Sequence, residues 1–178
     1  MKIACLGWGS LIWDSRELAI SKEGWNKDGP KLPIEFTRIS SDGRVTLIID
    51  KEAELKEVLW AEMEQKNLEE ACCILARREG TKLEKISHLT SDQKIDDKEA
   101  IRSEVRKWLG QKKLDAAIWT GLSYKNNKRP TIEEIISHLK DLQTCDRGRA
   151  EEYIRKAPKQ IDTSYREKIE LEFGWTPI

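Results

Sequence analysis

The feature that most constrains this chain is a short apolar strand that runs directly into a glycine-punctuated turn. The segment 2–6 has the composition of a buried strand, and it is followed at once by Gly7-Trp8-Gly9-Ser10-Leu11-Ile12-Trp13. Glycine has no Cβ, so the chain can adopt backbone angles here that a side chain would penalise. Successive exposed amides form a concave donor site for a carboxylate, a phosphate or an oxyanion. The turn therefore predicts an anion site, and the alternative is a tight strand-ending turn packed under two tryptophans.

Two nucleotide-binding motifs are excluded. A dinucleotide-binding fingerprint also places Gly-x-Gly after the first strand, but its third glycine falls on Ile12 in this chain. The apolar run 11–13 lies where that fingerprint needs a helix packed closely through glycine. The phosphate-binding pattern GxxxxGK[ST] does not occur in the sequence.

Length and charge predict one cytoplasmic domain that covers residues 1–178. The chain can bury a sizeable core, and no Pro/Gly/Ser-rich linker divides it. Lys+Arg and Asp+Glu both total 32, so no basic field attracts phosphate backbones and nucleic acid is excluded as a partner. The N-terminal apolar run is too interrupted by glycine to be a signal peptide, and we expect no membrane partner. The sequence does not predict an oligomeric state.

Cysteine and histidine usage predicts neither a metal site nor a thiol enzyme. The four cysteines lie at positions 5, 72, 73 and 145, without the spacing of a zinc site, and we expect reduced thiols. Only His88 and His138 could serve a Cys-His or Ser-His pair, and neither has a local catalytic signature. His138 lies in a predicted helix, where a structural role is expected.

The order of elements predicts an α+β fold. Asp42-Gly43 between two apolar runs indicates a hairpin turn. Strands are predicted early in the chain and helices late, which favours a small mixed β-barrel wrapped by helices. The predicted strands cover 2–7, 34–39, 44–50, 57–64, 82–88 and 116–122, and the helices cover 67–79, 97–109, a segment that begins at Thr131, 146–156 and 163–173.

The predicted helix 67–79 places one carboxylate on an apolar face. Asn67 begins the helix in capping-box form with Glu70, and the helix runs to Gly80. Partial burial and the negative end of the helix dipole would both raise the pKa of Glu79, which suits a group that accepts and returns a proton. The alternative is a glutamate that reaches around the helix end into water. Four residues spaced by four, three and four share the apolar stripe: Leu68, Cys72, Leu75 and Glu79.

Six short motifs follow one another along the chain: GWGSLIWD at 7–14, RVTLIID at 44–50, VLWAEM at 58–63, LARREG at 75–80, AAIWTG at 116–121 and GRAEEYI at 148–154. Each is similar to a motif of the gamma-glutamylcyclotransferase superfamily, most of all of its ChaC-type branch. They occur in that family's order, from the first strand to about residue 154. The chain therefore resembles this superfamily over most of its length.

This resemblance implies a reaction that needs no cofactor. The alpha-amino nitrogen of a gamma-glutamyl group attacks its own gamma-carbonyl, which releases 5-oxoproline and a free amine or peptide. By resemblance, the turn holds the glutamyl head group and Glu79 carries the proton from the attacking amine to the leaving one. Arg38, at the end of a predicted strand, could add a charge-assisted bond to the head group, and Tyr153 belongs to a helix start that borders the site. The candidate substrate-binding residues are Gly7, Trp8, Gly9, Ser10, Leu11, Arg38 and Tyr153, of which Arg38 matches no family motif strongly.

Two departures from the family pattern bear on the substrate. Trp8 stands where the family has tyrosine, and Ala150 stands where it has asparagine. An indole at the pocket favours conjugates with an apolar or aromatic leaving amine over glutathione. Two alternatives stay open beside the cyclotransferase: a non-catalytic small-molecule binding or regulatory module with the same pocket, and amide exchange on a gamma-glutamylated metabolite.

Overall fold

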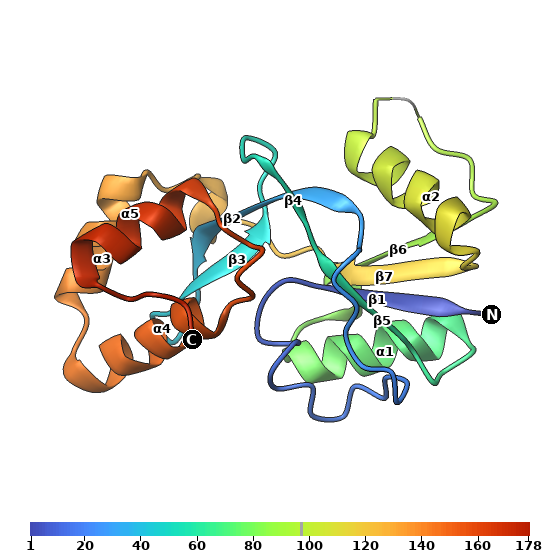
Figure 1. The fold of residues 1–178 in the computed structure, drawn as a ribbon, viewed down its shortest axis with the longest axis horizontal. Helices are drawn as coiled ribbons and strands as arrows, with labels where there is room; N and C mark the ends of the chain where they lie inside the picture. Colours follow the sequence, from blue (N-terminus) through green and yellow to red (C-terminus); the bar gives the residue numbers. More distant parts are fainter. Residues whose placement is uncertain (97) are drawn as a thin grey trace. The chain divides into compact units, whose positions relative to one another are not determined.

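The fold is α+β, as the order of elements predicted. A computed structural model describes residues 1–96 and 98–178, and its strands form two sheets (Figure 1). The chain divides into two compact units, each built from separate segments. The first unit comprises 1–7, 14–32 and 57–121, and the second comprises 8–13, 33–56 and 122–178. Whether the whole chain acts as one domain stays a prediction.

The first unit is built on a four-stranded mixed sheet. Its strands are β1 (Ile3–Gly7), β5 (Leu59–Glu62), β6 (Ile86–Thr90) and β7 (Ala116–Thr120), in the order β5-β1-β7-β6. β1 pairs antiparallel with β5 and parallel with β7, and β6 pairs antiparallel with β7. Every residue of the central strands β1 and β7 is buried, which explains their continuous apolar sequences.

Two helices pack against β6 and β7 in this unit: α1 (Leu68–Glu79) and α2 (Ala100–Lys112). The Asn67 side chain caps α1 by accepting from the Glu70 amide at 3.0 Å, as predicted. The capping box is incomplete, because the Glu70 carboxylate accepts from Gln65 instead. Gly80 ends α1 in the left-handed region, at φ +60°. The predicted start of α2 at residue 97 lies outside the described residues.

The predicted strand 57–64 is divided in two at Val58. The backbone N–H of Val58 donates to Pro30 O at 3.1 Å, and its carbonyl accepts from Gly29 N at 3.0 Å. A Cβ on Gly29 would overlap this carbonyl oxygen, so glycine is needed for the close approach. Because Val58 bonds to the 29–30 loop, β4 (Leu55–Glu57) and β5 belong to different sheets.

The second unit contains a three-stranded sheet in the order β3-β2-β4, with β2 (Lys31–Ile39) in the centre and β3 (Val45–Ile49) antiparallel to it. The predicted Asp42-Gly43 turn joins β2 and β3, and Gly43 adopts φ +81°. The His138 ring Nε2 lies 2.7 Å from Gly43 O, which gives this histidine a structural contact.

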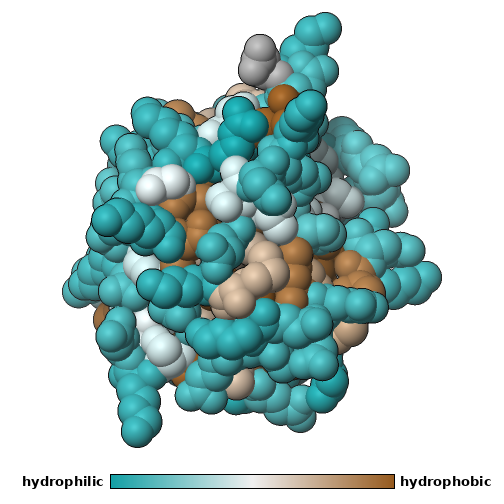
Figure 2. Space-filling model, turned by 90° about the vertical axis from the view of Figure 1, so that its right-hand side faces the viewer, coloured by the Kyte–Doolittle hydropathy of each residue, from teal (hydrophilic) through white to brown (hydrophobic). Residues whose placement is uncertain are grey.

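Figure 2 shows one face of the molecule, where the exposed apolar side chains form small groups among hydrophilic ones.

Three helices complete the second unit: α3 (Ile132–Asp141), α4 (Thr144–Lys156) and α5 (Ser164–Phe173). α4 packs on β3, and α3 contacts both other helices. Thr131 and Glu134 form the predicted capping box at the start of α3. Among the described residues neither sheet closes into a barrel, because β5 and β6 are the edges of one sheet and β3 and β4 of the other.

A buried arginine of α5 holds the end of α4. The Arg166 side chain is 2% exposed, and its guanidinium donates to four backbone carbonyls at 2.8–3.1 Å. Two of these lie at the end of α4, where helical partners run out: Ile154 O in its last turn and Ala157 O at the residue that caps it. The other two belong to Pro158 and Ile161 in the α4–α5 connection.

Asp50, directly after β3, is the second buried polar centre of this unit. Its carboxylate accepts from the Tyr124 hydroxyl at 2.7 Å and from Arg129 Nε at 2.8 Å, and the Glu52 amide donates at 3.0 Å. Burial by itself would raise the pKa of Asp50, but these hydrogen bonds together hold it below the ordinary value. Burial and the bond to Asp50 raise the pKa of Tyr124 to about 12.

We expect Arg166→Met to destabilise the protein by about 2–4 kcal/mol, because it removes the donors of four carbonyls inside the fold. Urea unfolding followed by circular dichroism measures this change. Arg149→Met is the control, since Arg149 forms an exposed ion pair with Asp146 on α4, and the loss of such a pair changes stability little. Equal effects of the two substitutions would show that the carbonyl contacts are not important for stability.

Asp50→Asn should reduce stability in a pH-dependent way. A depressed pKa in the folded state contributes stability above the ordinary aspartate pKa of about 3.9. That contribution is lost as the pH falls through the lower folded value. The gap in unfolding free energy between wild type and Asp50→Asn should therefore be largest near neutral pH and shrink below about pH 4. A gap independent of pH would contradict the assignment.

Candidate functional site

The turn after β1 is anchored in the second unit through Trp8. This side chain is 4% exposed, and its indole Nε1 donates to Leu47 O of β3 at 3.3 Å. The Ile12 amide donates to Gly9 O at 3.0 Å and closes a tight turn. Leu11 is buried and Ser10 is half-buried. Trp8 therefore fixes the turn to β3, the second strand of the β2–β3 hairpin.

Tyr153 of α4 packs directly on this turn. A Cβ on Gly9 would overlap the Tyr153 hydroxyl oxygen, so only glycine permits the observed approach. The same hydroxyl accepts from the Leu47 amide at 3.4 Å. The Trp13 and Tyr153 rings meet edge to face with centroids 5.4 Å apart. Residues 8–13 of the GWGSLIWD motif thus meet the GRAEEYI motif in the second unit. The two motifs lie near opposite ends of the chain.

Two arginines of the hairpin lie near this cluster. Arg38 Nη1 donates to Thr46 Oγ1 at 3.4 Å across the β2–β3 pair, and Arg38 is half-buried. The Arg44 guanidinium lies 5.6 Å from the centroid of the Tyr153 ring and donates to Asp42 at 2.7 Å. The sequence analysis predicted Arg38 as a site residue but did not predict Arg44, although Arg44 is the first residue of the RVTLIID motif.

Glu79 lies in the first unit, at the last residue of α1. Its side chain is 14% exposed, in keeping with its place on the apolar stripe. Arg78 Nη1 donates to its carboxylate at 2.7 Å, and the Arg78 side chain is 5% exposed. A guanidinium beside a carboxylate favours the ionised form. The sequence pattern did not predict this contact, and the neighbouring Arg77 is 69% exposed.

Arg78 also holds the segment that follows the turn. Its Nε and Nη2 donate to Asp14 O at 3.1 and 2.5 Å. Burial raises the pKa of the Cys5 thiol, the charge of Glu79 raises it further, and that of Arg78 lowers it. Within the first unit, Glu79 therefore lies within electrostatic reach of β1 and next to the arginine that fixes Asp14.

The structure brings together part of the predicted site. Trp8, Gly9 and Tyr153 are in mutual reach in the second unit, where Arg38 lies on the adjacent hairpin. Gly7, the last residue of β1, and Glu79 belong to the first unit. The pairing of Glu79 with the turn, and anion binding by the amides of residues 8–11, stay predictions.

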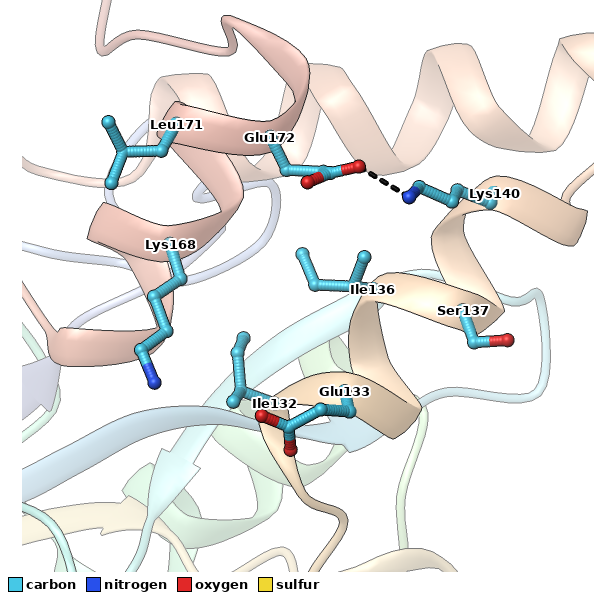
Figure 3. Close-up of a pocket in the computed structure, with 8 residues that line it drawn as sticks. All are labelled: Ile132, Glu133, Ile136, Ser137, Lys140, Lys168, Leu171 and Glu172. Carbon is cyan, nitrogen blue, oxygen red and sulfur yellow. Dashed lines mark ion pairs between the residues drawn. The ribbon is translucent and has the colours of Figure 1, made fainter.

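A separate groove lies between α3 and α5, and none of the predicted site residues lines it. Figure 3 shows Ile132 and Ile136 on α3 and Lys168 and Leu171 on α5, with a Lys140–Glu172 ion pair near one end. Its volume is about 570 Å³. Leu171 is 87% exposed, so this groove is a solvent-facing surface feature.

The described part of the chain contains no cluster of three or more His, Cys, Asp or Glu that could hold a metal ion. None of its helices combines the length and the apolar composition needed to cross a membrane. Comparison of the chain with models of known protein families, with curated proteins and with solved structures found no match.

We expect Gly9→Ala to destabilise the protein by about 1–3 kcal/mol, because the new methyl group meets the Tyr153 hydroxyl. In a Tyr153→Phe background that oxygen is absent, so the same substitution should cost clearly less. Thermal and urea unfolding of the two single variants and the double variant measure this coupling.

Gly110→Ala is the control for Gly9→Ala. Gly110 lies inside α2, and nothing lies within 4 Å of a Cβ built on it. Alanine there should stabilise the helix by about 0.5–1 kcal/mol. If Gly9→Ala costs the same in both Tyr153 backgrounds, the contact between the turn and α4 does not limit stability.

Proposed function

We propose that this protein is a gamma-glutamylcyclotransferase-like enzyme that converts a gamma-glutamyl amine or peptide to 5-oxoproline and a free amine. The observation that carries the proposal is the contact between Gly9 and Tyr153. These residues belong to the first and the last motif of the resemblance, which are implied to border one pocket. A chain that resembled the family by accident of composition would have no reason to join them.

The proposed reaction balances within the substrate and one carboxylate. The alpha-amino nitrogen forms a bond to the gamma-carbonyl carbon, and the bond from that carbon to the leaving nitrogen breaks. Glu79 accepts the proton that the attacking amine loses and returns it to the leaving nitrogen. The Arg78 guanidinium, 2.7 Å from Glu79, favours the ionised carboxylate that the first step requires. No cofactor takes part.

The head group is assigned to the turn and the hairpin. In this proposal the amides of residues 8–11 hold its carboxylate, and Arg38 adds positive charge from β2. Trp8, whose indole packs on β3, stands where a tyrosine would add a hydroxyl, and conjugates of apolar or aromatic amines are therefore the proposed substrates. Membership of the gamma-glutamylcyclotransferase-like superfamily, which rests on the order of the motifs, and a cytoplasmic location belong to the same proposal.

The test is a panel of gamma-glutamyl amines and peptides, glutathione included, incubated with the protein and analysed by mass spectrometry for 5-oxoproline. Glu79→Gln should lower kcat by about 10²–10⁴-fold, the range typical of a general acid–base group, with little change in KM. Glu69→Gln on the same helix is the control, because Glu69 is exposed in the first turn. Circular dichroism verifies that each variant is folded.

Two results would overturn the assignment. Full activity of folded Glu79→Gln would remove Glu79 from the proton transfer. Absence of 5-oxoproline from every conjugate in the panel would exclude a cyclotransferase for these substrates.

A second candidate is a non-catalytic module that binds a gamma-glutamyl compound. One observation favours it: the Glu79 carboxylate is engaged by the buried Arg78, as in a structural ion pair. This candidate predicts saturable binding of a conjugate by calorimetry, without turnover. Turnover separates the two, because only the enzyme would release 5-oxoproline from a conjugate that it binds.

A further inference from the structure

A second cavity lies in the second unit, beside β2 and the segment that leads into α3. Its volume is about 280 Å³, and it is lined by Thr37, Ile39, Lys125, Asn126, Lys128, Pro130 and Glu134. None of these residues belongs to the predicted cyclotransferase site. Most of the surface area that lines the cavity is apolar, because polar residues also contribute their carbon atoms. The charged groups come from one short loop and from the first turn of α3.

Thr37 gives this cavity an unused hydrogen-bonding group. The residue is fully buried at 0% exposure, and its Oγ1 has no hydrogen-bond partner among the described residues. A buried hydroxyl without a partner is unfavourable, since it has lost its bonds to water and gained none. Rotation about the Cα–Cβ bond directs this hydroxyl without moving the strand, so a ligand oxygen in the cavity could accept its hydrogen bond.

The charges at the cavity have a positive balance. Lys125 and Lys128 both line it, and Glu134 is the one acid among the lining residues. The Glu134 carboxylate is already engaged, because it accepts from the Thr131 amide at 2.8 Å and from Lys128 Nζ at 3.0 Å. Lys125 therefore supplies the net positive charge of the cavity. The backbone is curved here, since Asn126 and Asn127 both adopt positive φ.

We propose that this cavity binds a small organic oxyanion, a carboxylate or a phosphate ester on a short apolar body. Lys125 meets the negative group, the Thr37 hydroxyl donates to one of its oxygens, and Ile39 and Pro130 contact the apolar body. The site is independent of the cyclotransferase assignment, because it uses the surface of β2 that carries Thr37 and Ile39, whereas Phe36 on the same strand contacts Tyr153.

The experiment is an NMR titration of the whole protein, with backbone amide shifts as the readout. Butyrate and n-butyl phosphate carry the two oxyanions on the same body, and n-butylamine and 1-butanol are the matched controls. We expect saturable shifts at Thr37, Ile39 and Asn126 with at least one anion, and none with the two controls. Absence of saturable shifts at these residues with both anions, or equal shifts with n-butylamine, would overturn the proposal.

Two variants test the individual contacts. Lys125→Met should weaken binding of the anion by about tenfold, and Thr37→Val, which replaces the hydroxyl with a methyl group, by about three- to tenfold. Lys159→Met, an exposed lysine away from the cavity, should leave affinity unchanged. Thr37→Val should also raise the unfolding temperature of the free protein, since it removes a buried hydroxyl without a partner. Unchanged affinity in both cavity variants would exclude the proposed site.

Discussion

The guanidinium of Arg166 is the contact on which the second unit depends most. A cation that is 2% exposed is tolerated only where hydrogen bonds replace its water, and four backbone carbonyls do so here. These carbonyls belong to the end of α4 and to the connection into α5, so Arg166 fixes the position of α4. Tyr153 lies one residue before Ile154, whose carbonyl Arg166 binds. The geometry of the turn against Tyr153 therefore depends on a residue that does not touch the turn.

A second charged contact joins α5 to the hairpin. Glu35 of β2 is 2% exposed, and its carboxylate accepts from Ser164 Oγ and the Tyr165 amide at the start of α5. Burial raises the pKa of Glu35, against hydrogen bonds that lower it. An acid at a helix N-terminus compensates amides that lack helical partners. β2 thus contacts α5 through Glu35 and α4 through Phe36. Two adjacent residues of one strand therefore pack on two different helices.

In the first unit, Arg78 is also a buried arginine that donates to a backbone carbonyl. This buried side chain binds Asp14 O, just after the turn, and the Glu79 carboxylate at the end of α1. Removal of Arg78 or of Glu79 would take one ion-pair partner from the other buried side chain. The same pair orients Glu79, so stability and the proposed proton transfer depend on one contact. This is why the cyclotransferase and the non-catalytic module are separated by turnover and not by the presence of the carboxylate.

The sequence by itself determined most of the elements, because strand and helix patterns, caps and turn residues act over a few residues. Asn67, Thr131 and the Asp42-Gly43 turn all lie where local chemistry placed them. Local patterns do not encode which distant groups meet. Val58 bonds to the 29–30 loop and splits one predicted strand, which places its two halves in separate sheets. Of the predicted site, the turn and its residues could be predicted from the sequence. Tertiary packing alone decided three contacts: Gly9 with Tyr153, Arg78 with Asp14, and Arg166 with α4. Each of them joins segments that lie far apart in the chain or that meet only when two helices pack.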